Sequence, residues 1–361
     1  MNISSNFDVL IVYSEKLAIS AADNKVENQT PFPKNSVNES YNVVYGYFME
    51  TCERLGLKAA FTTSKDIIGA GTCSSYWLFI KNKWQKKNSY CHSELIFDKF
   101  SPIRKGIKTR RELLFSNPKI KPFNDPDLYN LFFDKQKTYE KLFEYAIPTI
   151  SLGENNDLES VEKACDTLSK LLSDHPDCKD FGTDIVMKDR FGAGGRHIYK
   201  FKSGQSKNML AAIERNTRVS YIIQPFAMFD QGFSYKNIYS STDIRLIYLK
   251  GEIVQSYIRV AKAGDFRCNE HQGGLLTYLN LDELPKDLVA KSGQIAKLLN
   301  KKCSLFTLDF IMSNNGNAYF LEGNTGPGLD WNMSLKKNEV EAKKLIDLVV
   351  KELGVRANFL N

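Results

Sequence analysis

The chain has 361 residues, of which 42% are hydrophobic and 25% are charged, and its formal net charge is +7. This length allows two or three domains with substantial cores, and the composition is ordinary for a soluble globular protein. Basic residues concentrate at 81–87 and 104–111, but no interleaved aromatic platform or named binding motif accompanies them. Nucleic acid is therefore not an expected partner.

The seven cysteines are widely spaced, their number is odd, and no Cys-x-x-Cys pair occurs. This usage argues against a disulfide framework and against a zinc site, and it favours a reducing compartment. No run approaches the roughly 18 apolar residues that a membrane-spanning helix needs, and no signal peptide is visible at Met1. We therefore expect a cytoplasmic protein with no membrane partner.

Apolar runs along the chain predict alternating strands and helices, which is typical of an α/β protein. Strands are expected at 7–13, 76–84, 95–100, 184–188 and 219–226, and a hairpin at 243–260 around Lys250-Gly251. Helices are expected at 45–55, 128–143, 158–172, 284–299 and 339–353. The polar stretch 21–40 is expected to be a loop, and Ile147-Pro148-Thr149 is expected to end the helix before it.

The most informative segment is Phe306–Leu329, which has the pattern of two apolar strands joined by the polar turn 314–317. If the turn consists of those four residues, Ser313 pairs with Ala318. The register of the whole hairpin follows from that pair, since side chains alternate between the two faces.

Each of these strands carries an acid where the pattern calls for an apolar residue, Asp309 in the first and Glu322 in the second. The register places the two acids directly opposite each other, and Asn324 falls on the same face. Like charges that face each other destabilise a hairpin unless something neutralises them. Two carboxylates and an amide suit Mg²⁺, which usually sits between carboxylates and phosphates. The hairpin therefore predicts a metal-nucleotide site.

A second motif is the loop 189–196, in which Lys188 ends a strand and Gly192, Gly194 and Gly195 follow. Glycine lets backbone N–H groups approach phosphates closely. The loop has neither the Walker sequence nor the Rossmann spacing. A plain glycine-rich hairpin turn is the alternative interpretation.

Three arginines, Arg245, Arg259 and Arg267, lie on or after the hairpin at 243–260, and the last precedes the glycine pair 273–274. Arginines that face a site can hold carboxylates or phosphates bidentately. A surface salt bridge is the alternative, above all for Arg259. Lys135 is expected inside an apolar helix, where a snorkelling side chain is the simpler interpretation if it is taken alone.

Taken in order, these motifs resemble the ATP-grasp superfamily, whose members make carbon–nitrogen bonds by activating carboxylates with ATP. They are most similar to the RimK-type amino-acid ligases. The ordered set is Lys135, Lys188 with the glycine loop, Gln224-Pro225-Phe226, Asp243-x-Arg245, Arg267-x-Asn269 before Gly273-Gly274, Asp309, and Glu322-x-Asn324. The likeness covers about residues 125–350 and is carried by 265–274 and 322–329.

The resemblance implies an α/β (α+β) ATP-grasp fold, in which two α+β subdomains grip ATP after a small α/β domain at 1–125. The first subdomain, 126–220, would carry the glycine-rich lid loop. The second, 221–361, would carry the metal-binding hairpin and a closing helix. The implied activity is that of an ATP-dependent carboxylate–amine ligase, which forms an amide through an acyl phosphate and releases ADP and phosphate.

The resemblance also implies ligands. The substrate would be an amino acid or peptide carboxylate with an amine co-substrate. The cofactors would be ATP with two Mg²⁺ ions, for which Mn²⁺ can substitute. Whether the protein forms a homo-oligomer is left open.

Roles for individual residues follow only from the resemblance. Lys135 and Lys188 would bind the phosphates of ATP, with Gly192, Gly194 and Gly195 closing over them. Asp309, Glu322 and Asn324 would bind the ions, Arg245 would steady the transferred phosphoryl group, and Arg267 with Asn269 would bind the activated carboxylate or the amine.

The strand edge at residues 224–227 would hold adenine, with Gln224, Phe226 and Ala227 as the contacts. Pro225 stands where relatives commonly have an acid, and it removes a backbone donor. We therefore expect the Gln224 carbonyl and the Ala227 N–H to contact the base, and Asp230 to bind the ribose.

Two other functions stay open at this point. A small-molecule kinase on the same fold would form ADP without an added amine and yield a phosphorylated product. A non-catalytic ATP-binding regulatory protein would bind ATP tightly without turnover.

Overall fold

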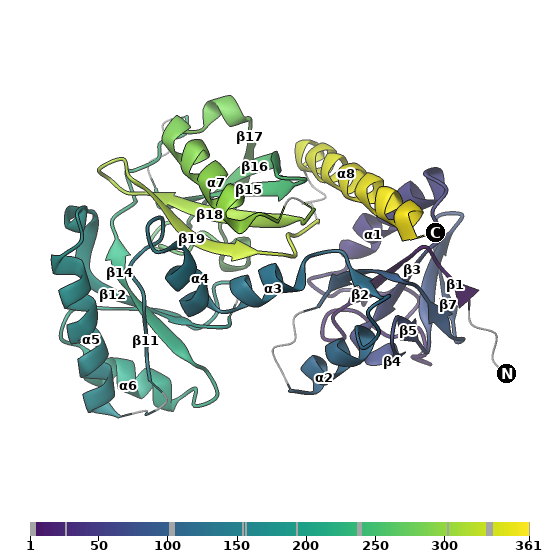
Figure 1. Cartoon of the computed structure of the whole chain (residues 1–361), viewed down its shortest axis with the longest axis horizontal. Helices are drawn as coiled ribbons and strands as arrows, with labels where there is room; N and C mark the ends of the chain where they lie inside the picture. Colours follow the sequence, from purple (N-terminus) through teal and green to yellow (C-terminus); the bar gives the residue numbers. More distant parts are fainter. Residues whose placement is uncertain are drawn as a thin grey trace. The chain divides into compact units, whose positions relative to one another are not determined.

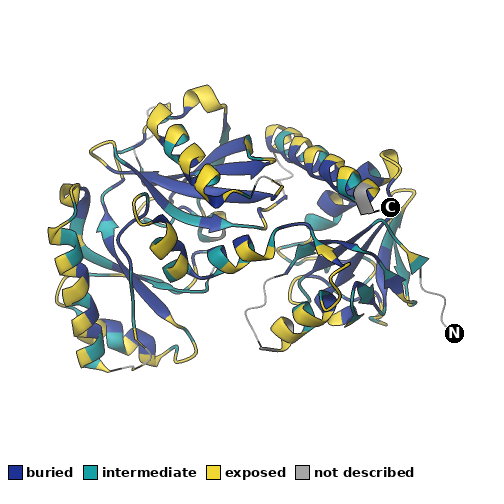
Figure 2. Cartoon of the chain, in the orientation of Figure 1, coloured by how far each residue is buried: buried dark blue, intermediate teal, exposed yellow. Residues whose placement is uncertain are grey.

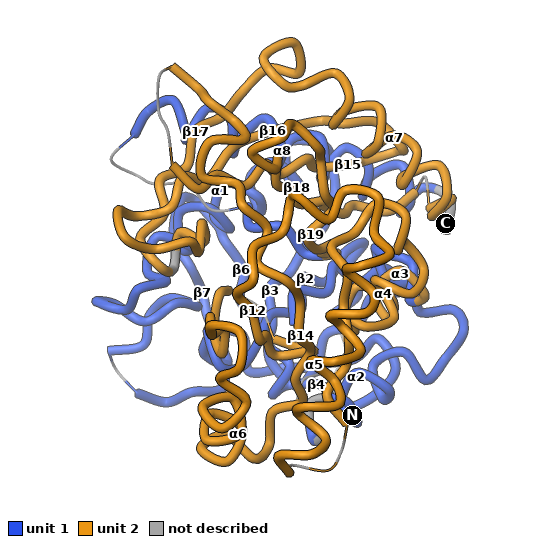
Figure 3. Tube along the Cα trace, turned by 90° about the vertical axis from the view of Figure 1, so that its left-hand side faces the viewer, with its two compact units in different colours: residues 1–126, 326–361 blue, residues 127–325 orange. Residues whose placement is uncertain are grey.

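The computed structural model describes residues 5–25, 27–100, 105–153, 155, 157–192, 194–236, 240–301, 303–329 and 335–360. The chain forms two compact units, residues 1–126 with 326–361, and residues 127–325 (Figure 3). The functional division expected at residues 125 and 220 stays a prediction, while the last helix of the chain belongs to the same compact unit as the N-terminal residues.

The first unit is built on a six-stranded sheet in the order β10-β9-β2-β3-β6-β7 (Figure 1). Its strands are β2 (Val9–Tyr13), β3 (Ala59–Thr63), β6 (Tyr76–Ile80), β7 (Lys83–Lys87), β9 (Leu95–Lys99) and β10 (Lys121–Pro122). A smaller sheet, β1-β8-β5-β4, consists of β1 (Ser5–Asn6), β8 (Cys91–His92), β5 (Thr72–Cys73) and β4 (Ile67–Gly69). The helices of this unit are α1 (Tyr41–Arg54), η1 (Ser64–Asp66), α2 (Lys105–Leu114) and α8 (Lys336–Leu360).

One carboxylate of the last helix contacts three side chains of the first helix. Asp347 of α8 accepts hydrogen bonds from Tyr47, Thr51 and Arg54 of α1, at 2.9, 3.4 and 3.1 Å. Asp347 thus links α8 to α1 within the first unit. Among the described residues, no helix has both the length and the apolar character that a bilayer crossing requires.

The single strand expected at 76–84 is wrong, because Lys81 and Asn82 take positive φ angles of 50° and 59° and reverse the chain between β6 and β7. In the basic run at 104–111, Arg104 lies outside the described residues. Arg110 and Arg111 of this run pair with Glu15 and Asp98.

The second unit contains two antiparallel sheets, which we call the roof sheet and the floor sheet. The roof sheet has the order β11-β14-β12-β13, with β11 (Ile150–Ser151), β12 (Phe181–Asp189), β13 (Ile198–Phe201) and β14 (Tyr221–Ala227). The floor sheet has the order β17-β16-β15-β18-β19, with β15 (Thr242–Leu249), β16 (Glu252–Val260), β17 (Leu275–Leu279), β18 (Phe306–Met312) and β19 (Ala318–Asn324). The hairpin expected at 243–260 is confirmed as β15–β16.

Helices cover one face of each sheet. Those of this unit are α3 (Pro126–Phe133), α4 (Lys135–Leu142), α5 (Leu158–Ser173), η2 (Cys178–Asp180), α6 (Ser206–Glu214), η3 (Glu270–Gln272), η4 (Leu281–Glu283) and α7 (Lys286–Leu299). Apolar side chains of α5 and α6 form one core with the roof sheet, and those of α3, α4 and α7 form another with the floor sheet. Figure 2 shows buried residues along the strands and exposed residues on the outer helix faces. The remaining faces of the two sheets are left for a site.

The single helix expected at 128–143 is wrong, because Asp134 interrupts it with an extended backbone (φ −109°, ψ 104°). Its carboxylate accepts hydrogen bonds from the N–H groups of Gln136 and Lys137, so Asp134 is the N-cap of α4. Lys135 is therefore the first residue of a new helix rather than a residue inside an apolar one.

Candidate functional site

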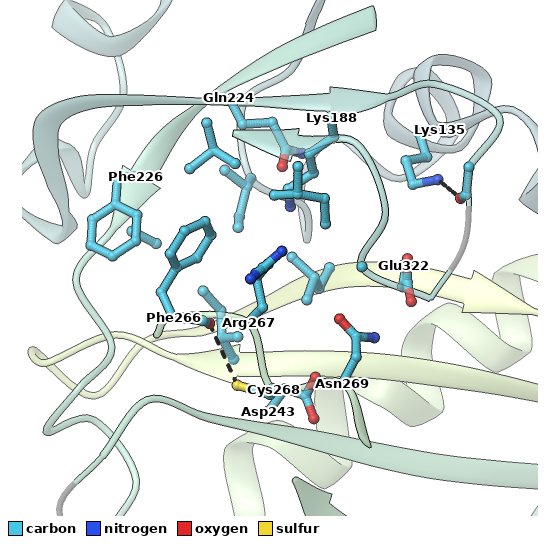
Figure 4. Close-up of a pocket in the computed structure, with 18 of the residues that line it drawn as sticks. Lys135, Lys188, Gln224, Phe226, Asp243, Phe266, Arg267, Cys268, Asn269 and Glu322 are labelled. Carbon is cyan, nitrogen blue, oxygen red and sulfur yellow. Dashed lines mark hydrogen bonds between the residues drawn. The ribbon is translucent and has the colours of Figure 1, made fainter. Parts of the chain in front are cut away.

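A cavity, whose space of about 830 Å³ includes open solvent at its mouth, lies within the second unit, between the uncovered faces of the roof and floor sheets (Figure 4). Most residues that the sequence singled out line it: Lys135, Lys188, Gly192, Gly194, Gly195, Gln224, Phe226, Ala227, Arg267, Asn269 and Glu322. A smaller cavity shares Lys135, Lys188 and Glu322 with it and adds Asn324. Residues separated by almost 190 positions are thus brought to one place.

The roof contributes a lysine, an amide and an aromatic ring from adjacent strands. In the β12–β14 pairing, Val186 lies opposite Gln224 and Lys188 lies opposite Ile222. Directly opposed residues share a face, and that face repeats at every second residue. Lys188, Gln224 and Phe226 therefore all face the cavity, as Figure 4 shows.

Burial lowers the pKa of the Lys188 ammonium to about 8, with Glu322 opposing this change and Lys135 adding to it. Burial thus makes the positive charge of this side chain costly. An anionic ligand that neutralises it is correspondingly favoured.

On the floor, the opposition of the two acids predicted from the sequence is confirmed. Asp309 of β18 pairs with Glu322 of β19, and Thr307 pairs with Asn324. Asp309, Glu322 and Asn324 therefore share one face of the hairpin, as the period of two requires.

The register predicted next to the turn is wrong by one residue. Ala318 pairs with Met312 rather than with Ser313. The N–H of Ser313 instead donates to the carbonyl of Asn317 at 2.8 Å, and the hydroxyl of Ser313 accepts from the N–H of Asn317 at 3.1 Å. The turn is therefore tighter than the sequence pattern suggested.

A β-bulge restores the register before the acids are reached. Phe310 pairs with Phe320, whereas Asp309 pairs with Glu322, so Leu321 is an extra residue in β19. With the turn as it is and no bulge, Glu322 would point to the opposite face, since a slip of one residue reverses every side chain. The bulge therefore turns Glu322 toward the cavity.

Two arginines neutralise the acids of the floor. Arg245 binds Asp309 through Nε and Nη2 at 2.7 and 2.5 Å, and its Nη2 lies 3.9 Å from Oε1 of Glu322. Nη2 of Arg259 donates to Asp309 at 2.9 Å, and the same guanidinium binds Asp243 at 2.7 and 2.8 Å. Arg259 is only 5% exposed, so its interpretation as a surface salt bridge is wrong.

These contacts determine the charge of Asp309, whose side chain has no exposed surface. Burial raises the pKa of this carboxyl, but Arg245 and Arg259 outweigh burial and hold the pKa below its ordinary value. Asp309 is therefore an anion within a buried charge network.

The residue between Glu322 and Asn324 is held by a ring from α3. A Cβ on Gly323 would lie 2.4 to 2.6 Å from three atoms of the Phe132 ring, which is 8% exposed. Glycine therefore allows Phe132 to pack directly against the backbone that carries Glu322 and Asn324.

We expect Gly323→Ala to lower the free energy of unfolding by about 1–3 kcal/mol, because the added methyl overpacks a closed contact. Phe132→Leu should relieve this clash, so the double variant should lose less stability than the two single variants together. Chemical denaturation of the four proteins measures this coupling. Additive losses would contradict the direct contact.

The glycine loop is tied to α4 at the edge of the cavity. Nζ of Lys135 donates to the carbonyl of Gly192. Arg190, at the start of the loop, binds Asp134 through Nε and Nη2 at 2.6 and 2.7 Å. Ala193 lies outside the described residues.

The loop also approaches the segment at 265–274. A Cβ on Gly195 would lie 2.8 Å from Oδ1 of Asn269, and Gln272 donates to the carbonyl of Gly194 at 3.4 Å. Within this segment, Asp265 accepts from Arg267 at 2.8 Å. The guanidinium of Arg267 points into the cavity (Figure 4).

Three of the residues expected in the site do not line either cavity. Arg245 and Asp309 lie in the charge network beneath Glu322. Asp230 is instead hydrogen-bonded to Asn314, at 2.9 Å, beside the turn of the β18–β19 hairpin. Asp243, which the sequence noted without assigning it a role, does line the larger cavity.

The apolar wall of the cavity was not found from the sequence. It is formed by Ile147, Val186, Ile198, Phe229, Phe266, Ile311 and Leu321. Single apolar residues of this kind occur throughout any core, so nothing in the sequence distinguishes them. The cavity is thus lined by both cations and apolar side chains, and Lys135 and Phe226 lie on opposite sides of it in Figure 4.

A family model, described as the RimK-like ATP-grasp domain, matches residues 159–349, which is more than half of the chain. Among curated proteins, the chain is similar to a probable alpha-L-glutamate ligase of Shewanella pealeana, at 27% identity over 177 residues, covering 49% of this chain and 35% of that protein. A probable alpha-L-glutamate ligase of Maridesulfovibrio salexigens is 30% identical over 162 residues, covering 44% of this chain and 51% of that protein. The chain thus spans at most about half the length of these relatives.

Among solved structures, the chain resembles the D-alanyl-alanine synthetase A of Vibrio cholerae, with a TM-score of 0.60 and 14% identity over 97% of this chain and 98% of that one. It also resembles the ATP-grasp ligase PsnB complexed with a variant precursor, Mg and ADP. This match has a TM-score of 0.54 and 12% identity, and it covers 98% of this chain and 100% of that one. At such identities the likeness concerns the fold, which is the ATP-grasp fold expected from the sequence. The chain therefore belongs to the RimK-like ATP-grasp family.

Proposed function

We propose that the protein is an ATP-dependent ligase that joins a carboxylate to an amine and releases ADP and phosphate. The observation that carries this proposal is the cavity that Lys135, Lys188 and the glycine loop line together with apolar side chains. The cations and the glycine loop suit a polyphosphate, and the apolar side chains suit a base. The membership of the family and the ligase names of the relatives support the same activity.

The residues divide the work of such a reaction. Lys135 and Lys188 bind the phosphates, and the glycines at 192, 194 and 195 bring backbone close to them. Arg267 and Asn269 hold the carboxylate, and Arg245 steadies the phosphoryl group as it moves. The γ-phosphoryl group is transferred to a carboxylate oxygen, and the amine then displaces phosphate from the acyl phosphate.

Metal ions belong to this proposal because the donors fit them. Asp309, Glu322 and Asn324 offer only oxygen ligands and share one face of a hairpin, which suits Mg²⁺, with Mn²⁺ as a substitute. Asp309 already accepts hydrogen bonds from Arg245 and Arg259, so an ion at this carboxylate competes with these donors. Two bound ions would supply neutralising charge to the polyphosphate.

We propose an amino acid or a peptide as the substrate. The relatives are named as glutamate ligases, and the structural neighbours include a D-alanyl-alanine synthetase and a ligase complexed with a precursor peptide. The cytoplasmic location and a homo-oligomeric state stay predictions from the sequence.

The proposal is tested with the purified chain, ATP, Mg²⁺ and pooled amino acids and cell extract, followed by mass spectrometry. We expect ADP and a product whose mass is the sum of two substrates less one water. A product that carries phosphate would favour the kinase. Tight ATP binding with no turnover across the pool would favour the non-catalytic protein. Either result contradicts the ligase.

A further inference from the structure

One hydroxyl on the floor sheet has no hydrogen-bond partner. Among the described residues, Oγ1 of Thr307 is a buried oxygen without a hydrogen bond, and the residue has no exposed surface. Leaving a polar group unpaired in this way costs about 1–3 kcal/mol, because its hydrogen bonds with water are lost and not replaced. A valine has nearly the same shape and would fill this position without that cost. The fold thus gains no hydrogen bond from this hydroxyl.

The register of the sheet places Thr307 next to the proposed metal ligands. On β18 it lies two residues before Asp309 and therefore on the same face, and on β19 its direct partner is Asn324. Directly opposed residues of an antiparallel pair have Cβ atoms about 4.5–5.5 Å apart, so a hydroxyl and a carboxamide at these positions can form a hydrogen bond. On its other side Thr307 lies opposite Ile247 of β15, whose side chain has no polar atom.

Of the polar neighbours on this face, Asn324 is the one that gains from an added acceptor. Asp309 is itself an acceptor and is already bound by Arg245 and Arg259. Asn324 lines the smaller cavity, whereas Thr307 is not among the described residues that line either cavity, so a ligand meets the carboxamide first. A carboxamide binds a hard cation through its carbonyl oxygen, and its NH₂ group then needs an acceptor elsewhere.

We propose that Thr307 positions Asn324 as an ion ligand, an inference that rests on the proposed ATP-dependent function. When Oδ1 of Asn324 binds the ion, Nδ2 donates to Oγ1 of Thr307. This hydrogen bond fixes which end of the carboxamide faces the cavity, and it satisfies the oxygen that is otherwise unpaired. Thr307 is a positioning residue, since it acts on the ion only through Asn324. It therefore favours the ion-bound protein over the ion-free protein.

The test measures how much Mg²⁺ strengthens the binding of ADP to the full chain. Calorimetric titrations with ADP are run once with Mg²⁺ and once with a chelator, and the ratio of the two affinities is the gain from Mg²⁺. Thr307→Val removes the hydroxyl and keeps the shape, and it should lower this gain by about tenfold, as the loss of a group that orients a metal ligand does. The affinity measured with the chelator should not change. Thr307→Ser, the matched control, keeps the hydroxyl and should retain the gain.

Stability is expected to change in the opposite direction. In the presence of the chelator, Thr307→Val should be at least as stable as the wild type in chemical denaturation, because an apolar group of the same shape replaces an unpaired buried hydroxyl. A merely structural role of Thr307 would instead lower the stability and leave the gain from Mg²⁺ unchanged.

A double-variant cycle with Asn324→Ala tests whether Thr307 acts through the carboxamide. In the Asn324→Ala background, Thr307→Val should not lower the gain from Mg²⁺ any further, because the group that Thr307 positions is already removed. An equal loss in both backgrounds would show that the hydroxyl acts on another group, which overturns the positioning role.

The remaining outcomes separate the two proposals. A wild type that does not bind ADP overturns the proposed function together with the role of Thr307. Binding of ADP that Mg²⁺ does not strengthen overturns the ion site, and the role of Thr307 with it. A gain from Mg²⁺ that is equal in the wild type and in Thr307→Val overturns the positioning role alone.

Discussion

Glu322→Gln is expected to abolish ligase activity without unfolding the protein, whereas Asp309→Asn is expected to lose both activity and stability. The two acids face each other on one hairpin, but their surroundings differ. Glu322 has a side chain that is 24% exposed and lies 3.9 Å from one guanidinium. Asp309 has no exposed surface and binds two guanidinium groups.

The expected magnitudes follow from these surroundings. Losing Glu322 as an ion ligand should lower kcat by about a thousandfold, since the charge that a metal supplies is worth several kcal/mol. The free energy of unfolding of the Glu322→Gln protein should stay within about 0.5 kcal/mol of that of the wild type. Asp309→Asn leaves two buried guanidiniums without their shared anion and should cost about 3–5 kcal/mol of stability.

Chemical denaturation and an ADP-release assay, run on both variants, make this comparison. Glu214→Gln, on the exposed face of α6, is the matched control and should change neither quantity. An active Asp309→Asn protein would refute the role of the floor acids in the reaction. A strongly destabilised Glu322→Gln protein would show that Glu322 supports the fold.

Lys188→Met is the second substitution with a large expected effect. Removing a positioned cation from a site where phosphoryl charge develops should lower kcat by about a hundredfold to a thousandfold. Methionine retains most of the buried length, so stability should change little, or rise, because the charged lysine is disfavoured by burial. Lys207→Met, on an exposed helix position, is the control. Unchanged turnover in Lys188→Met would contradict the proposed phosphate site.

The lowered pKa of Lys188 also predicts a pH dependence of nucleotide binding. Free Lys188 loses its proton as the pH rises through about 8, whereas a bound phosphate stabilises the ammonium and raises its pKa. Binding is therefore proton-independent below pH 8 and takes up a proton above it, so affinity should fall by up to about tenfold per pH unit. Titrations with ADP measure this slope. A Lys188→Arg protein should show no such slope, and a flat wild-type profile would contradict the prediction.

The hairpin shows how far the sequence alone can be used. The opposition of Asp309 and Glu322 was predicted from alternation and is confirmed, but the assumed turn was too long by one step. The extra residue Leu321 shifts the register back by one, so Asp309 and Glu322 still lie opposite each other. Bulges depend on local packing and twist rather than on the pattern of apolar residues, so no count along the strand reveals them.

The break at Asp134 is a different case, because the signal was present. An acid directly before a lysine inside a helical pattern is an N-cap candidate, but the apolar spacing on both sides favoured one continuous helix. The break at Asp134 places Lys135 at the start of α4, beside the glycine loop.

The hydrogen bond from Nε2 of Gln224 to the hydroxyl oxygen of Thr149, at 2.8 Å, could not be predicted from the sequence, since the two residues lie 75 positions apart. Only the pairing of β11 with β14 brings these segments together. The resemblance named Gln224 for its backbone carbonyl, whereas in the structure, among the described residues, Oε1 of its side chain is a buried oxygen with no hydrogen-bond partner. The partners of Arg259, Asp243 and Asp309, could not be predicted for the same reason, because these contacts also depend on the register of the sheet.

The fate of the carboxylate oxygen tests the central claim most directly. The purified chain is incubated with ATP, Mg²⁺, an amine pool and amino acids whose carboxylates carry a heavy oxygen isotope. If the carboxylate is phosphorylated before the amine attacks, one heavy oxygen atom leaves in each phosphate released, and mass spectrometry of the phosphate detects it. We predict this transfer, in step with amide formation. Phosphate that contains only ordinary oxygen, released while product accumulates, would contradict the account.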